Sequence, residues 1–149
     1  MSERRTERRL RLAAILLYSV AMAYVEAAVV VYLRRIYYPE GFVLTLEPME
    51  LHILRTEIGR EVATLAMILG ISLLSYQERM KRVGAFLFVF GIWDIFYYLF
   101  LKIILGWPSS FMTRDVLFLI PAPWISPVFV PVSISLIMAG FGVWLIQKK

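Results

Sequence analysis

The chain has 149 residues, of which 60% are hydrophobic and 18% charged, with a mean hydropathy of +0.74 and a formal net charge of +5. The absence of cysteine excludes disulfides, iron–sulfur clusters and thiolate metal sites, and the single histidine excludes bis-histidine haem within one subunit. This composition predicts an all-α integral membrane protein that forms one polytopic domain over residues 1–149.

The first long apolar run covers residues 12–33 and follows an arginine-rich leader. The leader and the sequence Ala21-Met22-Ala23 together resemble a secretion signal with its cleavage site. The apolar run continues for ten residues past Ala23, however, and reaches the roughly 20 residues that a helix needs to cross a bilayer. We therefore expect this segment to be retained as a spanning helix.

Three further spans are predicted at residues 57–76, 83–105 and 128–146. The uncharged run at residues 62–76 has fifteen residues, too few to cross about 30 Å at about 1.5 Å per residue. That helix must therefore begin at or before Glu57. The predicted architecture is a four-helix transmembrane bundle.

The basic residues predict the orientation of this bundle. With four spans, both termini and the turn at residues 77–82 share one side, which carries ten of the sixteen Lys and Arg residues. By the positive-inside rule this side is cytoplasmic. We expect a multi-pass protein of the cell membrane with cytoplasmic N- and C-termini.

The connection at residues 106–127 is expected to cap the outward end. Its segment 111–120 is too short to span and is apolar except for Thr113, Arg114 and Asp115. Proline, which cannot continue a helix ladder, follows at positions 121 and 123. We expect a short interfacial or re-entrant helix before the last span; the alternative is a surface helix anchored by neighbouring tryptophans.

Glu26 is the only charged residue of the first span. A carboxylate at the centre of a spanning helix costs about 2.5–3.5 kcal/mol, so Glu26 needs a partner on another helix. Ala23 and Ala27 flank it and would allow close packing.

The second span has two different faces. One is acidic, with residues spaced 7, 4 and 3 apart: Glu50, Glu57, Glu61 and Thr64. The other carries small residues and indicates the close approach of another helix: Thr56, Gly59, Ala63, Ala66 and Gly70.

Asp94 of the third span shares a face with Tyr97 and Tyr98, whose phenols can hydrogen-bond a carboxylate. At about 1.5 Å per residue, Glu26, Glu61 and Asp94 all fall in the outer half of the bilayer. The predicted site thus has four acids, one base and three supporting residues: Glu26, Glu57, Glu61 and Asp94; Arg60; Thr64, Tyr97 and Tyr98. Full ionisation would leave about three unbalanced negative charges, so a cation or protons must compensate them.

Three functions are compatible with this pattern. The first is an outward-facing carboxylate site for a divalent cation or for a cationic or proton-coupled solute. The second is a non-catalytic accessory or assembly subunit, in which such residues only hold helices together. The third is a membrane enzyme acting on a lipid or quinone, although no known catalytic motif is present.

A divalent metal ion is the candidate cofactor. Carboxylates alone would suit calcium or magnesium, and the addition of His52 would suit manganese or iron. The expected partners are the lipid bilayer and either a second copy of the chain or a partner membrane subunit. Nucleic acid is not expected, because the basic leader adjoins a span and so faces anionic lipid.

Overall fold

The computed structural model describes residues 2–37, 51–120 and 122–148. It contains four helices and a two-stranded sheet in this order: α1 (Ser2–Tyr37), α2 (Leu51–Ser75), α3 (Arg79–Leu105), β1 (Arg114–Phe118), β2 (Trp124–Pro127) and α4 (Phe129–Gln147). All four helices are long and apolar enough to span a membrane, as the sequence predicted. The helix α2 begins at Leu51. It thus starts before Glu57, as predicted from an uncharged run that is too short to cross a bilayer by itself.

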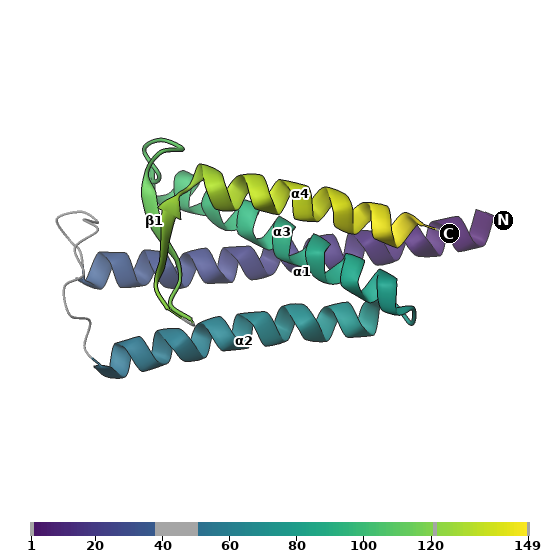
Figure 1. Cartoon of the computed structure of the whole chain (residues 1–149), viewed down its shortest axis with the longest axis horizontal. Helices are drawn as coiled ribbons and strands as arrows, with labels where there is room; N and C mark the ends of the chain where they lie inside the picture. Colours follow the sequence, from purple (N-terminus) through teal and green to yellow (C-terminus); the bar gives the residue numbers. More distant parts are fainter. Residues whose placement is uncertain (1, 38–50, 121, 149) are drawn as a thin grey trace.

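The four helices lie along a common direction, and each runs antiparallel to the one before it in the chain (Figure 1). Both termini and the α2–α3 turn lie at one end, which we call the terminal end, and the two strands lie at the other, the hairpin end. The helix α3 is central because it packs against α1, α2 and α4, whereas α1 and α2 barely approach each other along their backbones.

Glycines allow α3 and α4 to lie in close contact. A Cβ atom on Gly84 would lie 2.8 Å from the carbonyl oxygen of Gly142, and one on Gly142 would lie 2.7 Å from the amide nitrogen of Phe88. At the other end of α3, Gly106 adopts a left-handed conformation with φ of 68°, and its N–H donates to the carbonyl of Lys102. This conformation favours glycine and ends the helix.

The expected short helix at residues 111–120 is wrong, because this segment begins an antiparallel hairpin. The strands pair Arg114 with Pro127 and Val116 with Ile125, and a bulge follows Val116. The prolines that exclude a helix are compatible with the turn and edge of a hairpin, while the β-branched and aromatic residues of β1 and β2 favour strands. The hairpin covers the bundle and reaches across to α2 (Figure 1).

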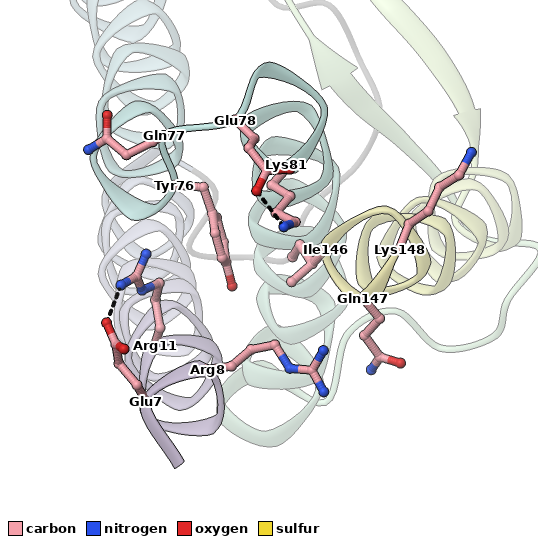
Figure 2. A pocket seen from close by; sticks show the side chains of 10 residues that line it. All are labelled: Glu7, Arg8, Arg11, Tyr76, Gln77, Glu78, Lys81, Ile146, Gln147 and Lys148. Atoms are coloured by element: carbon pink, nitrogen blue, oxygen red, sulfur yellow. Dashed lines mark hydrogen bonds and ion pairs between the residues drawn. The ribbon is translucent and has the colours of Figure 1, made fainter. Parts of the chain in front are cut away.

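The terminal end contains a cavity of about 410 Å³ between the start of α1, the α2–α3 turn and the end of α4 (Figure 2). Basic residues dominate its charged lining. The hairpin end carries the buried acids instead, so the two ends of the molecule differ in charge.

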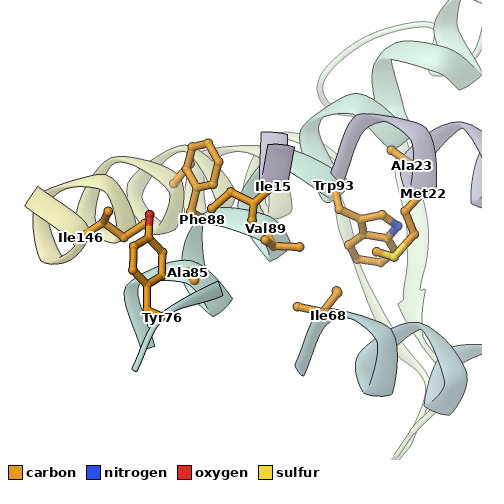
Figure 3. Packing of buried hydrophobic residues seen from close by; sticks show 11 residues of the cluster. Ile15, Met22, Ala23, Ile68, Tyr76, Ala85, Phe88, Val89, Trp93 and Ile146 are labelled. Carbon is orange, nitrogen blue, oxygen red and sulfur yellow. The ribbon is translucent and has the colours of Figure 1, made fainter. Parts of the chain in front are cut away.

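The apolar core follows the centre of α3. Figure 3 shows Trp93 beside Met22 of α1, and Phe88 towards Ile146 of α4. Ala23 is completely buried in this cluster, and Ala27 is also completely buried one turn further along α1. These two alanines flank Glu26 and bring its carboxylate into the bundle, as the sequence predicted.

Candidate functional site

The polar side chains of α1 and α2 meet at Arg60. One guanidinium nitrogen of Arg60 forms an ion pair with Glu26, and two others donate to Oε2 of Glu57 at 3.0 and 2.9 Å. The hydroxyl of Thr64 donates to the second oxygen of Glu26. Glu26 is only 4% exposed, and both of these partners belong to α2.

The spacing along α2 produces this arrangement. Glu57, Arg60 and Thr64 follow each other at intervals of three and four residues, which places them on the face of α2 that looks towards α1. Because α1 and α2 barely touch through their backbones, these side chains connect the two helices at the hairpin end, and a hydrogen bond from Arg11 to the carbonyl of Ser75 at 2.8 Å connects them at the terminal end.

Glu61 lies on the same face but contacts the hairpin. The backbone N–H of Leu119, just after β1, donates to both carboxylate oxygens at 2.9 and 3.1 Å. Glu61 is buried, and this donor is neutral. Its negative charge therefore has no direct ion pair among the described residues.

Asp94 is buried at the interface between α3 and α4. The hydroxyl of Ser135 donates to Oδ2 of Asp94 at 2.8 Å, which is again a bond from a neutral group. Lys102, the only base in the half of α3 nearer the hairpin, instead donates to the carbonyls of Gly106 and Pro108 at 3.1 and 2.8 Å. It caps its own helix and leaves Asp94 without an ion pair in the described part of the chain.

A second charged group, which the sequence pattern did not predict, lies nearby. Arg34 at the end of α1 is 3.6 Å from Asp115 of β1, and the hydroxyl of Tyr98 donates to the other oxygen of Asp115 at 3.2 Å. The guanidinium of Arg34 stacks over Trp107, 3.7 Å from the ring centre. Tyr98 therefore donates its hydrogen bond to Asp115 and not to Asp94.

Burial raises the pKa of Asp115 to about 6. The Arg34 guanidinium, the Tyr98 hydroxyl and a backbone hydrogen bond at Val116 oppose this rise but do not cancel it. Asp115 is thus a carboxyl that titrates closer to neutral pH than an ordinary aspartate.

Tyr97 connects the two charged groups. Its phenol is within electrostatic reach of Arg34, Arg60, Asp94 and Asp115. Its ring also packs edge-to-face on Tyr98 with 5.1 Å between centres. The predicted residues Glu26, Glu57, Glu61 and Asp94 therefore belong to one neighbourhood at the hairpin end, although each has its own hydrogen-bond partner.

The described residues contain no group of three His, Asp or Glu side chains arranged to hold a metal ion. His52 is exposed on the first turn of α2, where its carbonyl accepts a hydrogen bond from Thr56. Glu50, the fourth acid of the predicted stripe, lies outside the described residues. The chemistry available here is proton exchange and electrostatic attraction of a cation.

The fold and the buried charges define a multi-pass helical membrane protein with four candidate spans. No protein-family model, curated protein or solved structure matches the chain.

Proposed function

We propose that this protein binds protons or a small organic cation at the carboxylate cluster of its hairpin end. The observation that carries this proposal is an imbalance of buried charge. Five buried carboxylates gather there, on α1, α2, α3 and β1, and among the described residues only Arg34 and Arg60 form ion pairs with them: Glu26, Glu57, Glu61, Asp94 and Asp115. Uncompensated carboxylates in a low dielectric either hold protons or attract a cation.

The partners of the acids suggest separate roles. Arg60 pairs with both Glu26 and Glu57, so one negative charge of this trio stays unbalanced when both carboxylates are ionised. Glu61 and Asp94 receive hydrogen bonds only from neutral donors. They are the carboxyls that we expect to exchange protons or to contact the solute.

An organic cation or a proton suits this arrangement better than a divalent metal. Metal ions such as calcium and magnesium take several oxygen ligands around one point. The acids of the described residues are instead distributed along α1, α2, α3 and β1, with a hydrogen-bonded partner for each. Such a distribution favours the movement of a proton from one carboxyl group to the next.

The distribution of basic residues supports an outward-facing site in the cell membrane. Ten of the sixteen Lys and Arg residues belong to the termini and the α2–α3 turn, which share the terminal end. We propose that this end is cytoplasmic and that the hairpin end faces outward.

Calorimetry on purified protein tests the proposal. Methylammonium, guanidinium and Mn²⁺ are titrated at several pH values, in two buffers of different ionisation enthalpy so that released protons are counted. We expect methylammonium or guanidinium to bind with proton release, and Glu61→Gln and Asp94→Asn to abolish that release. Glu78→Gln, which removes an exposed acid at the terminal end, is the matched control and should bind like the wild type.

Absence of cation binding and of any proton release in the wild-type protein would refute the proposal. Binding of Mn²⁺ alone, lost in Glu61→Gln, would replace it with the divalent-cation site that the sequence also allows.

A second function, an accessory or assembly subunit, is favoured by the outer face of α2. Only 22% of the most apolar stretch of this helix is buried within the chain, the lowest share among the four spans. A Cβ atom on Gly59 or Gly70 would meet no atom within 4 Å, so the stripe of small residues is open to another helix.

Disulfide crosslinking in membranes tests this alternative, because the chain has no cysteine of its own. Ala63→Cys, on the small stripe, should form a covalent dimer if a second copy docks there. Leu69→Cys, exposed on a flank of α2, is the control and should remain monomeric. Equal crosslinking of both variants would indicate random collision.

A further inference from the structure

The cavity at the terminal end is separate from the carboxylate cluster and has the opposite charge. Its volume of about 410 Å³ falls within the range of roughly 300–1,000 Å³ that is usual for small-molecule sites. It is lined by four basic and two acidic residues, together with Tyr76, Gln77 and Gln147. The excess of positive charge favours an anion.

The basic side chains of the cavity differ in how far they are already engaged. Arg11 pairs with Glu7 at 2.8 Å, and Lys81 pairs with Glu78 at 2.6 Å. Arg8 has no carboxylate within ion-pair distance among the side chains that the structure describes. Its charge is therefore available to a ligand.

Tyr76 supplies a second, independent feature. Its side chain is only 6% exposed, and its buried hydroxyl has no hydrogen-bond partner among the described residues. Figure 2 shows this hydroxyl directed into the cavity, between Arg11 and Arg8. A buried hydroxyl without a partner is destabilising, and an oxygen atom of a ligand would satisfy it.

The phenol is suited to donate a hydrogen bond. Burial raises the pKa of Tyr76, and the opposing influence of Arg11 and Arg8 does not reverse this direction. Tyr76 is therefore protonated at neutral pH. The guanidinium of Arg11 also lies over the Tyr76 ring, 5.4 Å from its centre, which holds the cation beside the phenol.

We propose that this cavity binds a phosphate group, with the Tyr76 hydroxyl donating to a phosphate oxygen and Arg8 and Arg11 compensating its charge. Guanidinium groups bind phosphate oxygens through charge-assisted hydrogen bonds. The phosphate can come from the headgroup of an anionic phospholipid or from a soluble phosphate, because both present the same oxygens.

Binding measurements on detergent-purified protein test the proposal. Native mass spectrometry measures retention of phosphatidylglycerol against phosphatidylcholine with the same acyl chains, and ³¹P NMR measures binding of inorganic phosphate. We expect Arg8→Gln and Tyr76→Phe each to weaken binding about tenfold, as loss of a hydrogen bond to a charged group does. Two matched controls should leave binding unchanged: Arg9→Gln, with the same charge change on the same turn of α1, and Tyr32→Phe, at an exposed tyrosine.

The two ligands distinguish the two sources. Selective retention of phosphatidylglycerol without binding of inorganic phosphate identifies a lipid headgroup site. Binding of inorganic phosphate that depends on Arg8 and Tyr76 identifies a soluble phosphate. The proposal is overturned if neither ligand binds, or if Arg9→Gln weakens binding as much as Arg8→Gln while Tyr76→Phe has no effect.

Discussion

Arg60 forms the ion pair that connects α2 to Glu26 of α1 at the hairpin end. We predict that Arg60→Gln lowers the free energy of unfolding by about 3 kcal/mol, because it leaves the buried carboxylates of Glu26 and Glu57 without their cation. This value is at the lower end of the range for buried pairs, since the Arg60 side chain is 25% exposed. Unfolding by SDS in mixed micelles measures the change.

The double variant Glu26→Gln with Arg60→Gln separates the ion pair from other effects. It should be less destabilised than the sum of the two single variants, because both charges are removed together. Glu7→Gln breaks an exposed pair with Arg11 and serves as the control, with an expected loss below about 1 kcal/mol. An Arg60→Gln protein as stable as the wild type would show that the network contributes nothing to stability.

Asp115 gives a prediction about pH. Since burial raises its pKa from 3.8 to about 6, the proton on Asp115 stabilises the fold. That stabilisation is complete below about pH 3.8 and is lost as the pH rises through about 6. The chain has only two aspartates, so a ¹³C-carboxyl aspartate label gives two NMR signals, and Asp94→Asn assigns the one from Asp115. A midpoint near 4 for Asp115 would contradict the prediction.

The two charged groups differ in how well the sequence revealed them. Glu26 could be identified because a single charge within twenty-two apolar residues demands a partner. Arg34 and Asp115 could not, because Arg34 directly follows the predicted span at residues 12–33 and Asp115 lay in the segment that was expected to form a short helix. Their contact depends on how the hairpin folds back, which no local pattern encodes.

Among the elements, the contact between α3 and α4 is the least tolerant of added volume. A Cβ atom on Gly91 would overlap the carbonyl oxygen of Ser135 and lie 2.9 Å from the amide nitrogen of Ala139. These are backbone atoms and cannot rotate away. We predict that Gly91→Ala destabilises the protein by about 1–3 kcal/mol and weakens the nearby bond between Ser135 and Asp94.

The control for this prediction is Gly59→Ala on α2, where a new Cβ atom meets nothing within 4 Å. There the higher helix propensity of alanine should stabilise the protein by up to about 1 kcal/mol. Thermal melting compares the two variants. Equal effects at both positions would mean that α3 and α4 are not in close contact.

The helices were predictable from the sequence because each requires only a long apolar run, and their observed bounds differ from the prediction mainly where charged residues extend them. The hairpin could not be predicted from the sequence, because segment 111–120 is largely apolar. Apolarity alone does not distinguish a short helix from a strand. The β-branched residues Val116 and Ile125 were the available signal. Val116 and Ile125 pair with each other, and prolines separate them in the sequence, so the pairing could not be recognised from either segment alone.

For the whole molecule, the proposed orientation predicts which side of the membrane each end occupies. Gln77→Cys at the terminal end should react with a membrane-impermeant maleimide only after cells are permeabilised, whereas Ser109→Cys at the hairpin end should react in intact cells. Both positions are exposed, so accessibility within the protein does not limit the reaction. Reaction of both from one side would contradict four spans, and the reverse pattern would contradict the orientation.

The hydrogen bonds between Leu119 and Glu61 also set an order of events during synthesis. The two residues are 58 positions apart, so α2 emerges from the ribosome long before its donor exists. At about 5–20 residues per second the interval is roughly 3–12 s. Throughout that time the carboxyl group of Glu61 must remain near water, hold a proton or bind another donor. We therefore expect the final packing of α2 to be a late step, completed only after Leu119 has been synthesised.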